Sequence, residues 1–214
     1  LWVEDKDNFH ILGSTIDDAA GEAFDKGGKL LGLGYPAGHI IDQLAVWGDA
    51  EAFSFPVGLK SSADARLSFS GLKTSLRVMI EKHQHILTQK PTQYNEFEKS
   101  AQEFYNLCAS YQMAIVKALL LKIRYAIKIA QKKYSAPKNF PIVIGGGVAC
   151  NSLIRSEFNK KYPQSCFVKP EYCTDNAAMI ANYGRLHFDS AITYPETLSL
   201  DAKGRFINKK EMHV

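Results

Sequence analysis

Three consecutive glycines, Gly145 to Gly147, follow a short apolar run and precede a segment with helical periodicity. Glycines let the backbone approach a ligand closely, and the start of a following helix favours negative charge. The arrangement is typical of a nucleotide or phosphate site, with Gly146 and Gly147 as candidate ligand contacts. The turn has neither the Gly-Lys-Ser/Thr of a P-loop nor a Gly-x-Gly-x-x-Gly fingerprint, so a tight turn without a ligand stays the alternative.

Two polar side chains stand at the expected starts of helices. Asn151 opens a helix expected over residues 151–161, where its amide can bind a base edge or a sugar hydroxyl, or can cap the helix. Asp175 follows Thr174, which we expect to cap a helix over residues 175–187. Its carboxylate either interacts with the helix dipole or ligates a metal ion.

Four acidic side chains crowd one expected helix: Asp17, Asp18, Glu22 and Asp25. We expect this helix to begin with a capping box at Ser14 and to run to about residue 31. Like charges three or four residues apart lower the stability of a helix by a few tenths of a kcal/mol. This cost indicates that some of these carboxylates face a ligand such as a ribose. A solvated acidic face is the alternative. Asp42, four residues after Gly38, offers another carboxylate beside a glycine-rich loop.

Positive charge is concentrated in one part of the chain. No acidic residue lies between Glu103 and Glu157, although the net charge of the whole chain is only +4. Four basic residues in this gap share one helical face: Lys117, Arg124, Lys128 and Lys132. Such a face fits a nucleic-acid backbone, and a solvated helix surface is the alternative.

The composition restricts the class of protein. With 214 residues, 46% hydrophobic and 22% charged, the chain is expected to form one large globular domain or one and a half small ones. No apolar run approaches the roughly 18 residues of a membrane span. The four cysteines form no Cys-x-x-Cys and no two histidines stand four residues apart, so we expect a reduced, cytoplasmic protein without a complete metal site of its own.

The candidate residues depend on an alternation of strands and helices. We expect a hairpin over residues 1–12, a short helix over about 40–47, an irregular segment over 49–70, and helices over 71–133 interrupted near Lys90 and Pro91. Strands are expected over 141–144 and 166–168. Strand, glycine turn, helix, strand and helix predict an α/β fold. The first residues already look like a strand and the chain does not begin with Met, so we expect a piece of a longer protein.

Five stretches, in this order, resemble one family: 14–26 (STIDDAAGEAFDK), 30–38 (LLGLGYPAG), 69–74 (FSGLKT), 145–151 (GGGVACN) and 173–181 (CTDNAAMIA). The chain is similar to the tRNA N6-adenosine threonylcarbamoyltransferases over about residues 1–187. The resemblance implies the fold of actin, the sugar kinases and the chaperone ATPases, in which two α/β lobes clasp a nucleotide. Residues 1–48 would end the first lobe, residues 49–188 would form most of the second with a helical insertion over 71–135, and residues 189–214 would be a tail.

The resemblance also implies roles for individual residues. Asp25, Gly38, Asp42 and Asn151 would contact the adenylate, and Asp175 would ligate one divalent ion, iron or zinc. The family's histidine pair, which would complete that metal site, matches nothing in this chain, so this piece alone is expected to be inactive. The family's Pro-Gly-Gly is Pro-Ala-Gly at residues 36–38, which keeps Gly38.

The implied reaction moves a threonylcarbamoyl group from its adenylate to N6 of the adenosine beside the tRNA anticodon. The implied partners are tRNA, a paralogous dimerisation subunit and a small ATPase, and no membrane. An ATP-dependent phosphotransferase of the same fold and a non-catalytic paralogue stay open as alternatives. A metallopeptidase is disfavoured because no His-Glu-x-x-His is present.

Overall fold

A computed structural model describes residues 1–201, so residues 202–214 of the expected tail lie outside the description. The described part is α/β and mostly helical, with two small sheets. Strand β1 (Trp2–Val3) pairs antiparallel with β2 (Phe9–His10), which confirms the hairpin. Strand β3 (Ile142–Ile144) pairs parallel with β4 (Ser165–Phe167), with Ile142 opposite Ser165.

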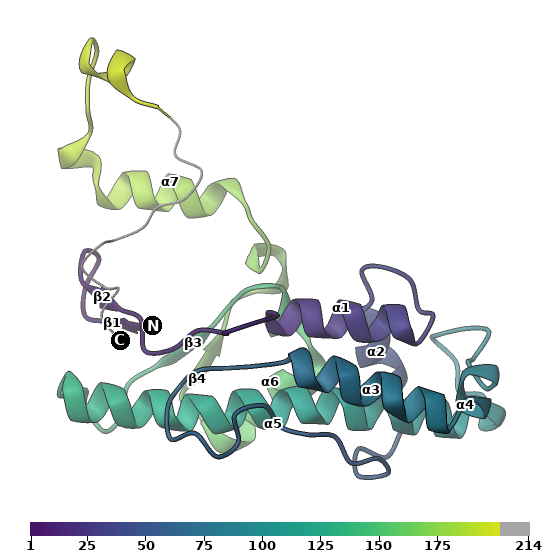
Figure 1. The fold of residues 1–214 in the computed structure, drawn as a ribbon. Coiled ribbons are helices and arrows are strands. Elements are labelled where there is room, and N and C mark those ends of the chain that lie inside the picture. Colours follow the sequence, from purple (N-terminus) through teal and green to yellow (C-terminus); the bar gives the residue numbers. More distant parts are fainter. Residues whose placement is uncertain (202–214) are drawn as a thin grey trace.

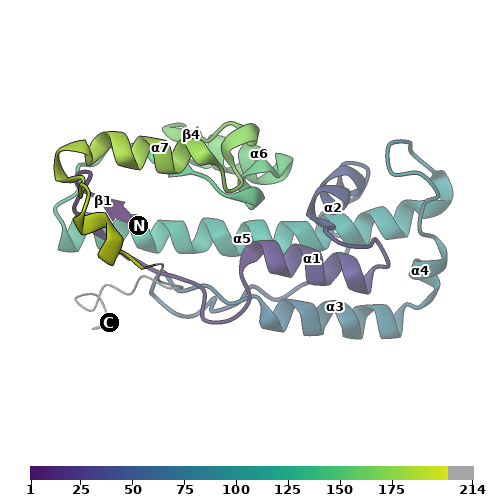
Figure 2. The same ribbon diagram turned by 90° about the horizontal axis from the view of Figure 1, so that it is seen from above.

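A long helix, α5 (Gln102–Lys133), runs along the molecule, and most of the shorter helices lie beside it (Figures 1 and 2). Seen from above, α3 and α6 lie on opposite sides of α5 (Figure 2). The predicted interruption of the helical region falls between α4 and α5, as expected near Lys90. The helices are α1 (Ala20–Leu30), α2 (Gly38–Ala45), α3 (Ser70–Lys82), α4 (His85–Thr88), α5 (Gln102–Lys133), α6 (Ser152–Lys161) and α7 (Ala177–Leu186).

The first half of α5 supplies the centre of the core. Phe104, Tyr105 and Ile115 are fully enclosed there, and α2 packs against α5. Burial of such side chains is the main driving force for folding. The Tyr111 hydroxyl donates a 2.7 Å hydrogen bond to the carbonyl of Ala23, so α5 also fixes the position of α1.

The predicted capping box of α1 is wrong. The helix begins at Ala20, and the Glu22 carboxylate accepts a 2.8 Å hydrogen bond from the Ala19 N–H. Asp17 instead accepts hydrogen bonds from the N–H groups of Phe69 and Ser70, at the start of α3. Partial burial would raise the pKa of Asp17, but the hydrogen bonds from residues 68–70 outweigh it and the pKa is lowered. A carboxylate in the α1 segment therefore anchors α3.

The predicted start of the last helix is also wrong. Asn176, rather than Thr174 or Asp175, is the N-cap of α7, and its side chain accepts a hydrogen bond from the Met179 N–H at 3.2 Å. Asp175 therefore lies outside the helix, one residue before the cap. The helix α7 has no buried residue and stands apart from α5 (Figure 1).

Lys122 is a buried cation that holds the irregular segment before α3 against α5. Its side chain is 2% exposed, and its ammonium donates to the carbonyls of Leu59, Ser62 and Asp64 at 2.8–3.1 Å. The Asp64 carboxylate lies 3.7 Å from the same nitrogen. One side chain thus satisfies three backbone acceptors that would otherwise need water.

Replacing Lys122 by methionine should lower the free energy of unfolding by about 2 kcal/mol, because the three carbonyls lose their donor. Urea denaturation measures the change. The control is Lys117→Met on the same helix. The exposed Lys117 ammonium lies 2.8 Å from the Glu51 carboxylate, and this substitution should change the free energy of unfolding by less than about 0.5 kcal/mol. Equal effects of the two substitutions would contradict this role of Lys122.

No helix within residues 1–201 is long and apolar enough to cross a membrane.

Candidate ligand-binding site

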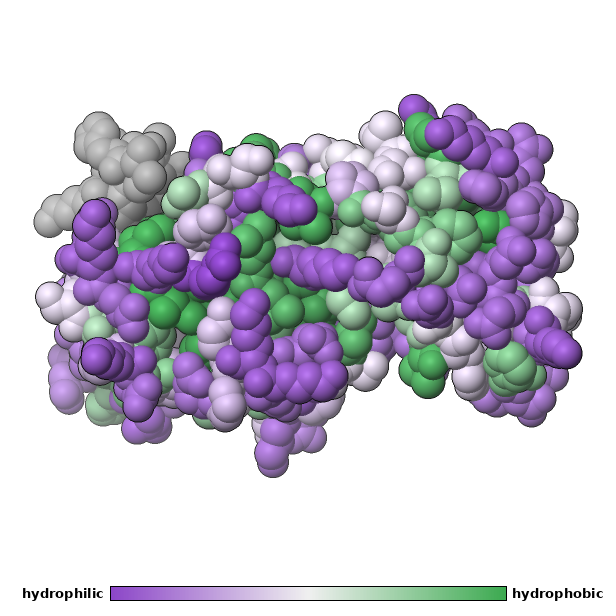
Figure 3. Space-filling view, turned by 90° about the horizontal axis from the view of Figure 1, so that it is seen from below, coloured by the Kyte–Doolittle hydropathy of each residue, from purple (hydrophilic) through white to green (hydrophobic). Residues whose placement is uncertain are grey.

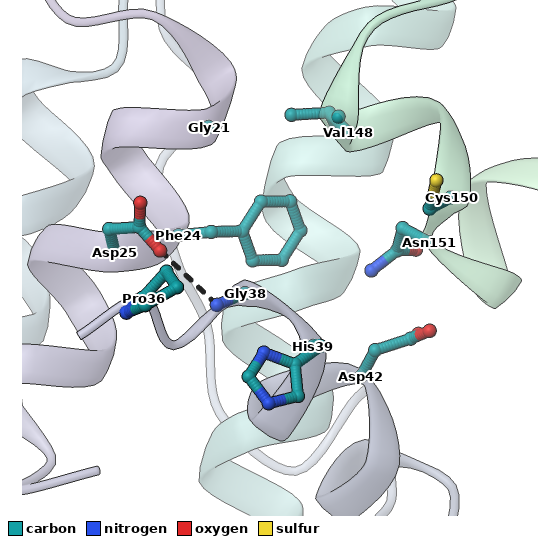
Figure 4. Close-up of a pocket in the computed structure, with 11 residues that line it drawn as sticks. Gly21, Phe24, Asp25, Pro36, Gly38, His39, Asp42, Val148, Cys150 and Asn151 are labelled. Atoms are coloured by element: carbon teal, nitrogen blue, oxygen red, sulfur yellow. Dashed lines mark hydrogen bonds between the residues drawn. The ribbon is translucent and has the colours of Figure 1, made fainter. Parts of the chain in front are cut away.

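A cavity of about 340 Å³ lies where α1, α2 and the glycine turn meet. Its volume falls in the range of small-molecule sites. Phe24, which is 3% exposed, projects its ring toward the cavity from α1, and Val148 faces it from the turn (Figure 4). The residues that line the cavity are Gly21, Phe24, Asp25, Pro36, Gly38, His39, Asp42, Gly147, Val148, Cys150 and Asn151.

Asp25 joins the two helices on one side of the cavity. Its Oδ1 accepts hydrogen bonds from the N–H groups of Ala37 (2.9 Å) and Gly38 (3.3 Å), at the first turn of α2 (Figure 4). The carboxylate therefore neutralises the positive end of α2. Its Oδ2 makes no hydrogen bond within residues 1–201, so it is available to a ligand hydroxyl.

Asp42 and Asn151 make up the opposite side. Both oxygens of Asp42 accept hydrogen bonds from Ser152, one from its N–H and one from its hydroxyl, each at 2.8 Å. Asn151 is the N-cap of α6: its Oδ1 accepts from the Ile154 N–H at 3.0 Å, which confirms the capping interpretation. Its Nδ2 donates to Gln112 at 2.8 Å, which leaves the second amide hydrogen for a ligand.

The glycine turn has the backbone that its sequence predicts. Gly146 has φ +84°, a conformation that side chains with a Cβ rarely adopt, and Gly147 begins the short 3₁₀ helix η2 (Gly147–Cys150). A Cβ at Gly145 would lie 3.2 Å from Val168, so this glycine permits close packing against the segment after β4. The turn follows the carboxyl end of β3, where open α/β sheets place their ligands.

The structure brings five of the candidate residues together and separates the others. Asp25, Gly38, Asp42, Gly147 and Asn151 line the cavity, although they come from segments more than a hundred residues apart. Three predicted groups do not line it: Gly146, Asp175, and the four basic residues Lys117, Arg124, Lys128 and Lys132.

Sequence reasoning misses several lining residues. His39 stands on α2 three residues before Asp42, and its imidazole makes no hydrogen bond within residues 1–201 (Figure 4). Phe24 precedes Asp25, and Cys150 precedes Asn151. The one signal in the sequence that could have identified these lining residues is that Phe24 and Cys150 each directly precede a predicted contact. The amphipathic pattern of α1 indicates that Phe24 is buried, but not that it lines a cavity.

An apolar floor with separate polar atoms at the rim fits a flat heterocycle that carries hydroxyl groups. The carboxylates of Asp25 and Asp42 place negative charge at the rim of the cavity. An anionic group of the ligand would therefore lie away from them, at the glycine turn. Fold and site together define an α/β protein with a cavity of small-molecule size beside the carboxyl end of a parallel strand.

Comparison with known proteins identifies the family. A family profile described as tRNA N6-adenosine threonylcarbamoyltransferase matches residues 1–182. A protein of that name from Thermosipho africanus is 38% identical over 205 residues, which covers 92% of this chain and 55% of the relative. One from Anaeromyxobacter dehalogenans is 43% identical over 182 residues (83% and 48%), and one from Lawsonia intracellularis is 36% identical over 214 residues (96% and 58%).

The chain belongs to the tRNA N6-adenosine threonylcarbamoyltransferase family, as the resemblance predicts. It spans about half the length of the curated relatives that it matches.

Proposed function

We propose that this chain takes part in transferring a threonylcarbamoyl group from threonylcarbamoyl-adenylate to N6 of the adenosine beside the tRNA anticodon. The N6 amine attacks the carbamoyl carbon, the bond from that carbon to the phosphate oxygen breaks, AMP leaves and the amine loses a proton. The observation that carries the proposal is the cavity between α1, α2 and the glycine turn, in a chain that belongs to this family.

Different lining residues bind different parts of the adenylate. The nearly buried ring of Phe24 closes the apolar floor of the cavity and gives adenine an apolar contact. The free Oδ2 of Asp25 and the remaining lone pairs of Asp42 accept from ribose hydroxyls, and Asn151 donates its second amide hydrogen. The phosphate lies toward Gly147, away from both carboxylates. Fixing the adenylate in this way contributes proximity and orientation to the attack.

The described residues do not form a metal site by themselves. Residues 1–201 bring no three His, Cys, Asp or Glu side chains together in a group that could hold an ion. Asp175 offers one exposed carboxylate, which we propose as a single ligand of the divalent ion, iron or zinc, that the family resemblance implies.

The basic face of α5 is the proposed contact for tRNA. Lys117, Arg124, Lys128 and Lys132 are all exposed, whereas Lys122 is buried and belongs to the core. On the side of the molecule that carries α5, hydrophilic side chains run across the surface and hydrophobic surface lies beside them (Figure 3). Exposed cations beside apolar surface suit a phosphate backbone with unstacked bases, although Lys117 must exchange its ion pair with Glu51 for the phosphate.

Replacing these four basic residues by alanine should weaken tRNA binding and reduce the slope of log K against log salt by about one unit for each phosphate that the protein no longer neutralises. Filter binding over a range of salt concentrations measures the slope. The control replaces Lys82, Lys99, Lys160 and Lys161, four exposed lysines on other elements, with the same change in net charge. An equal reduction of the slope in both variants would show a general charge effect and remove the proposed contact.

The activity is tested with the protein expressed from its complete gene. Labelled threonylcarbamoyl-adenylate and tRNA should give label in tRNA, with release of AMP. The rival function, an ATP-dependent phosphotransferase, would instead transfer phosphate from labelled ATP. Phosphate transfer without labelling of tRNA would overturn the proposal.

A further inference from the structure

A polar side chain lies among apolar ones in the middle of α5. Gln112 is 2% exposed. One turn away on the same helix, Cys108, Ile115 and Val116 are fully enclosed. A buried amide destabilises the folded state unless it forms hydrogen bonds, and an apolar side chain of similar size would avoid this cost. The hydrogen bond that Gln112 forms is therefore expected to have a structural or functional role.

The partner of Gln112 is the amide of Asn151, 39 positions further along the chain. The Oε1 of Gln112 accepts a 2.8 Å hydrogen bond from Nδ2 of Asn151, and both side chains are more than nine-tenths buried. Gln112 also lines a second cavity, of about 410 Å³, which gives the Nε2 end of its amide access to water. Within residues 1–201, the Oε1 end binds Asn151 alone.

Two hydrogen bonds together fix the orientation of the Asn151 amide. Its Oδ1 accepts from the Ile154 N–H at 3.0 Å, and its Nδ2 donates to Gln112 from the other end of the same planar group. The two N–H bonds of an amide nitrogen point in different directions. With one of them fixed on Gln112, the direction of the other is also fixed. Figure 4 shows the nitrogen of Asn151 pointing toward the cavity.

We propose that Gln112 is a positioning residue for the nucleotide, because it holds the Asn151 amide so that the free N–H points at the ligand. This inference rests on the proposed function, since it concerns how Asn151 binds the adenylate. Gln112 does not line the nucleotide cavity and acts through Asn151. A donor that is already held in place loses less freedom when the ligand binds, so its hydrogen bond contributes more to the affinity.

Gln112→Met removes the acceptor. Methionine keeps the length of the side chain and a high helix propensity, but its sulfur accepts hydrogen bonds only weakly. The affinity of the complete protein for AMP, measured by calorimetric titration, should fall about two- to tenfold, the effect of one hydrogen bond. Gln112→Glu keeps an oxygen toward Asn151 and should bind AMP within about twofold of the unchanged protein. Unchanged affinity in Gln112→Met would overturn the proposal.

Ser110 provides the matched control, because it is a buried polar residue of α5 whose hydrogen bonds lead away from Asn151. It is 3% exposed, and its hydroxyl accepts from the Phe53 N–H and donates to the Asp49 carbonyl, both at 3.1 Å. Ser110→Ala should lower the midpoint of urea denaturation, as Gln112→Met does, and leave the affinity for AMP unchanged. An equal loss of AMP affinity in both variants would show a general effect of destabilisation and overturn the role of Gln112.

A double variant decides whether Gln112 acts through Asn151. Asn151→Ser keeps a side chain that caps α6 but removes the amide nitrogen, so adding Gln112→Met should weaken AMP binding no further. A second, full loss of affinity would show that Gln112 acts by another route, which would overturn this inference and leave the nucleotide site in place. Failure of the unchanged protein to bind AMP would instead overturn the proposed function, and the role of Gln112 with it.

Discussion

Replacing Phe24 by alanine should lower the free energy of unfolding by about 3–5 kcal/mol, the usual cost of removing a buried aromatic ring. Phe24 is 3% exposed and packs where α1 meets α2 and the cavity. The substitution also removes the floor of the cavity, so binding of AMP should be lost together with stability. Thermal or urea denaturation gives the first effect, and calorimetric titration with AMP gives the second.

Phe24→Leu separates the two effects. Leucine keeps most of the apolar volume and should cost about 1 kcal/mol, so the protein stays folded. Leucine changes the shape of the cavity floor that Phe24 forms, so the affinity for AMP should still fall although the protein stays folded. The control is Phe188→Ala, at a residue that is 77% exposed and should change neither quantity. Unchanged AMP affinity in Phe24→Leu would show that adenine does not lie on this ring.

Replacing Gly28 by alanine should destabilise the protein by about 3 kcal/mol through overpacking. A Cβ at this position would lie 2.1 Å from the Cβ of Ala37, a distance that real atoms do not reach. The helix α1 must therefore move away from α2, which lengthens the hydrogen bonds that Asp25 accepts from residues 37 and 38. The expected result is a loss of stability together with weaker binding of AMP.

Gly184→Ala in α7 is the matched control for Gly28. No atom of residues 1–201 lies within 4 Å of a Cβ built at Gly184, so the substitution should stabilise the helix by up to about 1 kcal/mol. Chemical denaturation of both variants in parallel measures the difference. A Gly28→Ala protein as stable as the unchanged protein would show that the close approach of α1 and α2 is not required.

Most elements can be predicted from local patterns. The apolar periodicity that ends at Lys133 and the short apolar run before the glycine turn predict the end of α5 and the strand β3, whereas α5 begins at Gln102, about eleven residues after the predicted interruption near Lys90 and Pro91. Asn151 is expected at the start of α6 because its side chain caps a helix wherever the backbone allows it, and the cap is confirmed.

Some features cannot be predicted because the partner of a side chain is distant in sequence. Local pattern assigns Asp17 to its own helix, but its partners are the N–H groups that begin α3, about 50 residues later. Asp42 reaches Ser152 across 110 positions. Periodicity carries no information on such contacts, so the cavity that joins α1 and α2 to the glycine turn can be proposed only from the family resemblance. The sequence alone does not distinguish the buried Lys122 from the exposed lysines near it, because its partners on residues 59–64 are also distant in sequence.

We propose that an adenine nucleotide binds between α1, α2 and the glycine turn. A crystal structure of the complete protein with a non-hydrolysable threonylcarbamoyl-adenylate analogue tests it most directly. We predict adenine against Phe24, ribose hydroxyls within hydrogen-bond distance of Asp25 or Asp42, and the phosphate near Gly147. An analogue bound at another site, with this cavity empty, would contradict the account.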